Sequence, residues 1–163
     1  KKIAKKTSST LIHSGYSRLL VDCNRSLKSK DAFIKKSEDT IIPGNIGINK
    51  NEKIVRANKY YFPYHNQIQK IIEKNIKKKI IPIIVSIHSF TPIYKNKSRP
   101  WHIGLLHRDD KKLMKPIFNY LKNCNSLKVK KHHEGIYLFC FSFWYCSIFF
   151  CSRDCCKTSR WEC

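Results

Sequence analysis

Three short segments of the chain carry side chains that are suited to chemistry. They are Asp22-Cys23-Asn24-Arg25, His88-Ser89-Phe90-Thr91-Pro92 and Arg99-Pro100-Trp101-His102. A guanidinium group binds a carboxylate through two parallel charge-assisted hydrogen bonds. An imidazole can bind a metal ion or transfer a proton near neutral pH. These residue types suit the binding of an anionic group. For His88 taken alone, a hydrogen bond to Ser89 or Thr91 is the commoner arrangement.

His88 stands at the end of a predicted strand. Residues 80–87 are short, apolar and mostly β-branched, which predicts a strand buried on both faces of a parallel or mixed sheet. Open α/β sheets bind ligands beyond the carboxyl ends of their strands, and Pro92 prevents the strand from simply continuing. His88 is therefore well placed for a functional role.

The remainder of residues 1–130 alternates between strand and helix signals. The expected elements are a strand over 16–22, a surface loop over 28–50, helices over 51–62 and 64–79 separated by Pro63, a loop over 92–100, a strand over 102–107 and a last helix that begins at Asp109 or Asp110. Asn49 or Asn51 would cap the first helix. Strands and helices in this order predict an α/β layer domain.

The charge of the chain is strongly positive. The 163 residues include 33 Lys and Arg against 11 Asp and Glu, a net charge of +22, which by itself would suggest a nucleic-acid partner. Most of the charge is Lys scattered among Ile and Asn, a composition typical of proteins encoded by AT-rich DNA. No zinc-finger spacing or basic stripe interleaved with aromatic residues accompanies it. We therefore expect no specific nucleic-acid partner.

The chain from about residue 131 to 163 differs in composition from the rest. Six of the eight cysteines lie in residues 140–163, among Phe, Trp and Tyr. The apolar run is shorter than the roughly 18 residues that usually span a bilayer, and its cysteines match no zinc module. We expect a partial domain over 1–130 and a tail over 131–163 that is disordered or not its native continuation. Because Lys1 opens no signal-peptide pattern, we also expect an internal fragment of a cytoplasmic protein, with no membrane partner.

The three chemical segments, taken together, resemble the N-formylglutamate amidohydrolase family. Further segments fit the same family in the same order over roughly residues 15–128. These are Tyr16-Ser17-Arg18, Pro43-Gly44-Asn45, the pair Glu52 and Arg56, and Pro63-Tyr64-His65. The resemblance implies a zinc-dependent amide hydrolase. Its fold would be a partial carboxypeptidase-like mixed sheet with flanking helices, incomplete at both ends.

The resemblance also implies roles for individual residues. His88 looks like one ligand of a catalytic zinc ion, which usually takes three protein ligands and a water. Asp22-x-Asn24-Arg25 also resembles an element of the aspartoacylases in which Asn and Arg grip a substrate carboxylate. Asp22 would then hold Arg25 or the loop in place.

Three further residues complete the implied site. Arg18 would polarise the scissile carbonyl and stabilise the oxyanion. Arg99 would hold a second substrate carboxylate, and His102 would donate a hydrogen bond or transfer a proton. The resemblance thus implies a ligand that is a small N-acyl amino acid carrying carboxylates.

The leading hypothesis is hydrolysis of N-formyl-L-glutamate to formate and L-glutamate, a step of histidine degradation. The family's early metal-binding loop is expected before Lys1. His13-Ser14-Gly15 looks like part of it, but its position directly before Arg18 makes that likeness a coincidence. Because the tail also replaces the segment with the expected general base, we expect this chain alone to be inactive. The alternatives are a related amidase for another N-acyl amino acid and a basic protein that binds nucleic acid or anionic surfaces. The oligomeric state stays open.

Overall fold

The computed structural model describes residues 1–37, 39–89, 92–94, 96–107, 111–133, 138–140 and 147–151. The chain divides into two compact units. One unit comprises residues 12–79, and the other comprises residues 1–11 and 80–163. The boundary near residue 130 that the composition suggests stays a prediction.

The second unit, residues 1–11 and 80–163, holds most of a six-stranded sheet with the strand order β1-β10-β4-β9-β7-β8. Its strands are β1 (Thr10–His13), β4 (Ile83–His88), β7 (Ile103–His107), β8 (Val129–His133), β9 (Leu138–Cys140) and β10 (Ser147–Cys151). β4 pairs parallel with β9 and antiparallel with β10, and β7 pairs parallel with β8 and antiparallel with β9. The predicted mixed α/β sheet is confirmed.

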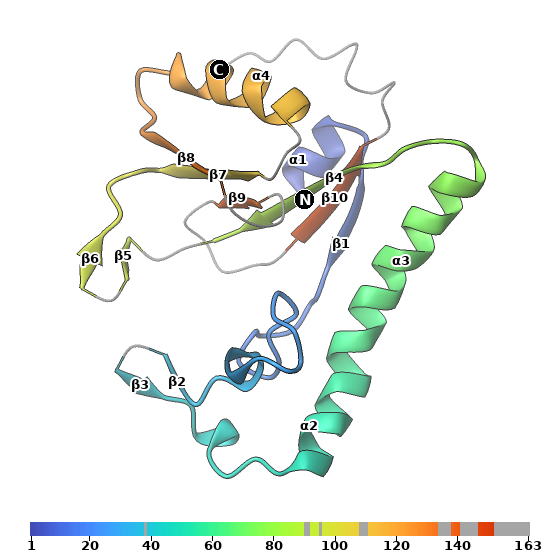
Figure 1. Cartoon of the computed structure of the whole chain (residues 1–163), viewed down its shortest axis with the longest axis vertical. Helices are drawn as coiled ribbons and strands as arrows, with labels where there is room; N and C mark the ends of the chain where they lie inside the picture. Colours follow the sequence, from blue (N-terminus) through green and yellow to red (C-terminus); the bar gives the residue numbers. More distant parts are fainter. Residues whose placement is uncertain are drawn as a thin grey trace. The chain divides into compact units, whose positions relative to one another are not determined.

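Short elements and one long helix complete this unit. They are α1 (Lys2–Lys6), the hairpin of β5 (Ile93–Tyr94) and β6 (Lys97–Ser98), and α4 (Lys111–Lys122). α4 packs against β7 and β8 (Figure 1). Its buried Met114 and the buried Ile103 and Leu105 of β7 belong to the core. The amphipathic pattern predicted this helix; its expected cap, Asp109 or Asp110, lies outside the described residues.

β4 begins after Pro82 and ends at His88. Proline lacks an amide hydrogen for the sheet, so it is tolerated just before the first residue of a strand. Ser86 is buried, and the other side chains of β4 are half-buried. The strand predicted over 80–87 is therefore shifted, and His88 is its last residue. Phe90 and Thr91 of the following segment lie outside the described residues.

The first unit is dominated by one run of helix, which Figure 1 shows as a single rod. It consists of α2 (Lys50–Arg56), a π-helical turn η3 (Ala57–Tyr61) and α3 (Phe62–Lys77). Asn49 caps α2 by accepting a hydrogen bond from the Glu52 amide at 2.8 Å, which confirms one of the two expected caps. The expected interruption at Pro63 does not occur. Pro63 lies in the first turn of α3, where a missing amide hydrogen is tolerated.

The segment predicted as a strand over residues 16–22 is irregular instead, and the nearest strand is β1, upstream of it. The Leu20 amide donates to the Ser17 carbonyl at 3.0 Å, which makes a turn. The Leu19 carbonyl accepts from the Asn45 side chain at 2.8 Å, and the Leu20 carbonyl accepts from Arg56 at 3.4 Å. Side chains thus satisfy the backbone groups that a neighbouring strand would otherwise satisfy, and the strand prediction is wrong.

The predicted loop over 28–50 contains three short elements. They are the 3₁₀ helices η1 (Lys30–Phe33) and η2 (Pro43–Asn45) and a hairpin of β2 (Lys36–Ser37) and β3 (Thr40–Ile41). Val21, Ala32 and Phe33 form a small buried core. The described residues contain no helix of a length and apolarity that would cross a membrane.

Asn45 gives a test of how this unit is held together. Its side chain is fully buried and donates to the Leu19 and Ile34 carbonyls, each at 2.8 Å. Replacing Asn45 with Ala would leave two carbonyls without this donor, and each buried unsatisfied group costs about 1–3 kcal/mol. We expect Asn45→Ala to lower the free energy of unfolding by at least about 2 kcal/mol, measured by urea unfolding followed through tyrosine fluorescence. The control Asn66→Ala, on the exposed side of α3, should stay within about 0.5 kcal/mol of the unchanged protein. Equal effects would contradict this account.

Candidate functional site

Asp22 is the centre of the turn that carries the first chemical segment. Its side chain is buried. Oδ2 lies 3.0 Å from the Arg18 guanidinium, and Oδ1 accepts a hydrogen bond from the Asn24 amide at 2.9 Å. The Asp22 carbonyl also accepts from the Arg25 amide at 3.0 Å. An aspartate that bonds the backbone two residues ahead forms an Asx turn, so both carboxylate oxygens hold local structure.

Asn24 and Arg25 follow this anchor and are exposed. Within the described residues, no hydrogen bond or ion pair engages the Arg25 side chain. A guanidinium presents five N–H donors in a rigid fork. The Arg25 guanidinium is therefore exposed to solvent, on a turn whose backbone Asp22 fixes.

Arg18 joins the same group through Asp22. Its side chain is about half exposed, whereas that of Asp22 is 7% exposed. Of the two arrangements expected for Asp22, the structure shows the one in which it holds the loop. Its ion pair is with Arg18 rather than with Arg25. The structure thus brings Arg18, Asp22, Asn24 and Arg25 together.

A network of hydrogen bonds around Arg56 was not predicted from the sequence. Arg56 Nη1 donates to Asn45 Oδ1 at 2.6 Å, and Nη2 donates to the Gly44 carbonyl at 2.7 Å and pairs with Glu52. The Arg56 side chain is only 13% exposed. Two features of the sequence pointed to this network: the Pro-Gly-Asn segment and the i,i+4 pair of Glu52 and Arg56. Only the fold shows that they bond to each other.

His65 is a second residue that sequence reasoning left without a role. Its Nε2 lies 3.0 Å from the Cys23 carbonyl, and its ring lies 4.2 Å from the Tyr61 ring, centroid to centroid. Burial lowers the pKa of His65, and the Cys23 carbonyl opposes that shift. The pKa of Tyr61 is raised by burial and, to a smaller degree, by Cys23 and Asp22. The sequence feature that could have indicated a role for His65 is Pro63-Tyr64-His65, one of the segments that resemble the N-formylglutamate amidohydrolase family.

The other predicted site residues belong to the sheet unit. His88 is half-buried at the end of β4, and its Nε2 lies 2.9 Å from Ser86 Oγ. The Arg99 amide donates to the Pro92 carbonyl at 2.7 Å. His102 Nδ1 accepts from the Lys128 amide at 3.0 Å. Because Nδ1 accepts, the imidazole is neutral with its hydrogen on Nε2, which leaves Nε2 as a hydrogen-bond donor.

A metal site requires several ligand side chains close together, and the described residues can be searched for such a group. Among them, no group of three or more His, Cys, Asp or Glu side chains could hold a metal ion. His88 supplies one imidazole, whereas a catalytic zinc ion usually takes three protein ligands. The described residues therefore do not by themselves fit a zinc site.

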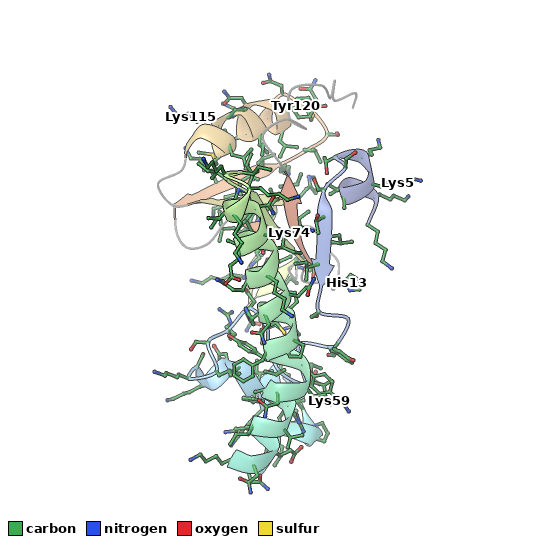
Figure 2. All side chains as sticks on the ribbon, turned by 90° about the vertical axis from the view of Figure 1, so that its right-hand side faces the viewer. Lys5, His13, Lys59, Lys74, Lys115 and Tyr120 are labelled. Atoms are coloured by element: carbon green, nitrogen blue, oxygen red, sulfur yellow. The ribbon has the colours of Figure 1, made fainter. Side chains whose placement is uncertain are left out.

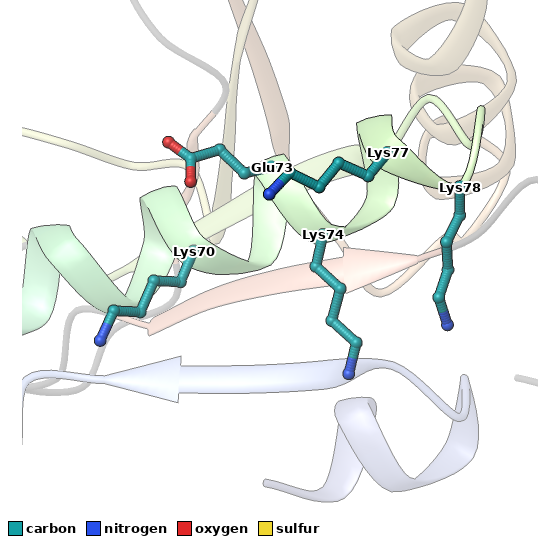
Figure 3. A pocket seen from close by; sticks show the side chains of 5 residues that line it. All are labelled: Lys70, Glu73, Lys74, Lys77 and Lys78. Carbon is teal, nitrogen blue, oxygen red and sulfur yellow. The ribbon is translucent and has the colours of Figure 1, made fainter.

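The surface of α3 carries a concentration of positive charge. Lys70, Lys74, Lys77 and Lys78, with Glu73, line a hollow of ≈ 480 Å³ (Figure 3). Glu73 accepts a hydrogen bond from Gln69 at 2.9 Å, and all five lining residues are exposed. Figure 2 shows Lys59 and Lys74 extending from the same helical run. Lysines on an exposed helix ordinarily form a solvated face.

Comparisons with known proteins identify the class of this molecule. It is a mixed α/β protein that is similar to the crystal structure of gene product Atu2144 from Agrobacterium tumefaciens, with a TM-score of 0.66 and 25% sequence identity. The match covers 78% of this chain and 58% of that chain, so this chain corresponds to a little over half of its length. A search of curated proteins found no match.

A model of the N-formylglutamate amidohydrolase family matches residues 2–134. The chain belongs to the N-formylglutamate amidohydrolase family, which is a family of hydrolases. The match confirms the family that the motifs indicated, and it extends beyond the expected 15–128 at both ends, so that it includes His13.

The lowered pKa of His65 predicts a pH dependence of stability. In the unfolded chain His65 has its ordinary pKa of 6.5, and folding lowers it. The unfolded chain therefore binds more protons, and stability falls as the pH drops from about 6.5 through the lower folded pKa. We expect the unchanged protein to lose more stability than His65→Gln between about pH 7.5 and about pH 5.5, measured by urea midpoints. His13→Gln, which alters an exposed histidine, should retain the unchanged protein's slope. Equal slopes for all three proteins would contradict the shift.

Proposed function

We propose that this chain binds N-formyl-L-glutamate and contributes to its hydrolysis to formate and L-glutamate. The observation that carries this proposal is the exposed Arg25, on a turn that the buried Asp22 fixes, in a chain that belongs to the N-formylglutamate amidohydrolase family. An exposed fork of donors on a rigid backbone suits a planar carboxylate. The same geometry would serve other N-acyl amino acids, so the acyl group is the finer part of the proposal.

The substrate has two carboxylates and one scissile amide, and the proposal assigns residues to each. Arg25 and Asn24 bind one carboxylate, and Arg99 binds the second. Arg18 lies against Asp22 at 3.0 Å with about half of its side chain exposed, so it can orient toward the formyl oxygen while the ion pair limits its movement. Charge that develops on that oxygen during attack is stabilised by such a fixed cation.

His102 is the proposed proton carrier. Its Nδ1 is occupied by the Lys128 amide, which directs its exchangeable hydrogen to Nε2. An imidazole with a fixed tautomer can donate a hydrogen bond from that atom and can transfer a proton.

Zinc remains part of the proposal on the ground of family membership. A bound zinc ion would supply an activated water near neutral pH. His88 is the ligand that we propose from this chain, and the described residues contain no cluster of three or more His, Cys, Asp or Glu that would complete the site. The carboxypeptidase-like arrangement of the sheet is likewise proposed from the family, with the mixed sheet as its support.

Binding of N-formyl-L-glutamate tests the role of Arg25. Lysine keeps the charge but not the two-pronged contact, so Arg25→Lys should raise the Kd about tenfold, measured by calorimetry on the full chain. The control Lys28→Gln removes a nearby exposed charge and should change the Kd less than about twofold. Equal losses in the two variants would show that net charge, not a site at Arg25, attracts the ligand. Zinc-dependent release of formate by this chain would further show that it suffices for the reaction, contrary to the expectation from its sequence.

Zinc binding tests the role of His88. Removing a ligand should weaken the metal strongly, since loss of even an outer-shell partner costs about 10–100-fold in affinity. We expect His88→Ala to raise the apparent Kd for Zn²⁺ by about tenfold or more and His13→Ala to leave it unchanged, both measured by competition with a chromogenic chelator. An effect of His13→Ala alone would transfer the ligand role to the His13-Ser14-Gly15 segment.

A further inference from the structure

The peptide group between Cys23 and Asn24 is held at both of its polar ends. Its carbonyl oxygen lies 3.0 Å from His65 Nε2, and its amide hydrogen is donated to Asp22 Oδ1 at 2.9 Å. A carbonyl oxygen can only accept, so Nε2 carries the hydrogen in this contact. One peptide unit is thus fixed between α3 on one side and the buried Asp22 carboxylate on the other.

The imidazole is itself held in place by its surroundings. His65 lies in the first part of α3, one helical turn after Tyr61, whose ring lies 4.2 Å from the imidazole. The Tyr64 ring approaches edge-on with its centroid at 5.2 Å, and Tyr64 is buried. The π-helical turn Ala57–Tyr61 ends where this contact begins. Single π-turns inside helices occur frequently at functional sites.

The fixed peptide determines where Asn24 and Arg25 point. In a tight turn, rotation of a central peptide group exchanges one turn type for another and changes the dihedral angles of the residues on both sides. Without the bond from His65, one of the contacts that oppose this rotation would be lost, and the bond to Asp22 would remain. Because the Cα of Asn24 adjoins this peptide directly, a rotation there would redirect its side chain and that of Arg25.

We propose that His65 is a positioning residue, which holds the Cys23–Asn24 peptide so that Asn24 and Arg25 present their side chains in one arrangement to the substrate carboxylate. This inference rests on the proposed function of Asn24 and Arg25. Both the neutral imidazole with its hydrogen on Nε2 and the imidazolium can donate to the carbonyl, so the positioning does not require a particular charge. Tyr61, Tyr64, Cys23 and Asp22 are the titratable groups that surround the ring and its contact.

Amide hydrogen exchange on the full chain tests the positioning directly. His65→Phe keeps an aromatic ring beside Tyr61 but removes the donor. We expect exchange of the Asn24 and Arg25 amides to accelerate at least about tenfold, while the Lys53 amide, which donates to Asn49 at 3.2 Å in the same unit, stays unchanged. His65→Gln, which retains an N–H donor, should restore part of the protection, and Asn66→Ala, next in the chain, is the matched control. Unchanged exchange at Asn24 and Arg25 in His65→Phe would overturn the proposal.

Ligand binding separates this inference from the proposed function. For N-formyl-L-glutamate, His65→Phe should raise the Kd about as much as Arg25→Lys does under conditions in which both variants are folded. Loss of the donor should also lower the urea midpoint, but a merely structural role would leave the Kd of the folded protein unchanged. If the unchanged chain binds no N-formyl-L-glutamate, the proposed function fails, while the exchange result still decides the positioning. If His65→Phe does not fold, the unchanged chain decides the question: the Asn24 amide chemical shift should follow the protonation of His65 in an NMR titration, and a shift that does not respond would overturn the proposal.

Discussion

The carbonyl groups of Leu19, Leu20 and Cys23 must find hydrogen-bond donors without the help of a neighbouring strand. Asn45, Arg56 and His65 supply these donors, each from a different element. These contacts are part-buried. A fully buried carbonyl without a partner costs about 1–3 kcal/mol, so even a fraction of that cost matters for a small unit. A shift of η2, α2 or α3 against this segment would therefore break one of these bonds.

The arginines of this unit differ in whether their donors bond to the protein or face solvent. Arg56 directs its guanidinium inward, where Gly44, Asn45 and Glu52 occupy its donors. Arg25 is exposed on the turn that this network supports. A guanidinium whose donors are satisfied by the protein stabilises structure, whereas one that faces solvent on a fixed backbone is available for a ligand. Arg18 lies between these cases, since it binds Asp22 with about half of its side chain still exposed.

The sequence predicted the features that depend on local chemistry. The Asn49 cap, the amphipathic pattern of α4 and the run that ends at His88 each follow from residues within a few positions of one another. A strand was predicted over 16–22 because Leu19-Leu20-Val21 has the composition of a strand, but the prediction is wrong. The partners of this segment are side chains 26 and 36 residues away, and long-range contacts of this kind override local propensity. The order of strands in the sheet is long-range in the same way. The roles of Asn45 and His65 were not predicted because their partners are also distant in the sequence. Both residues nevertheless lie in segments that resemble the family.

The motifs that carried the family resemblance therefore have two structural roles in the first unit. Some present exposed side chains, and others form hydrogen bonds to the backbone. Asn24 and Arg25 are exposed and chemically suited to a ligand. The Pro-Gly-Asn segment, the Glu52–Arg56 pair and His65 bond to the backbone at or before the turn instead. Asn45 can satisfy Leu19 only if Pro43 and Gly44 place it in η2, and Arg56 can reach Leu20 and Gly44 only from the end of α2. The backbone at and before this four-residue turn thus accepts hydrogen bonds from side chains as distant in sequence as Asn45, Arg56 and His65. The residues of the turn can be recognised in the sequence, whereas the distant side chains that bond to the neighbouring backbone are identified only in the fold, because long-range contacts bring them together.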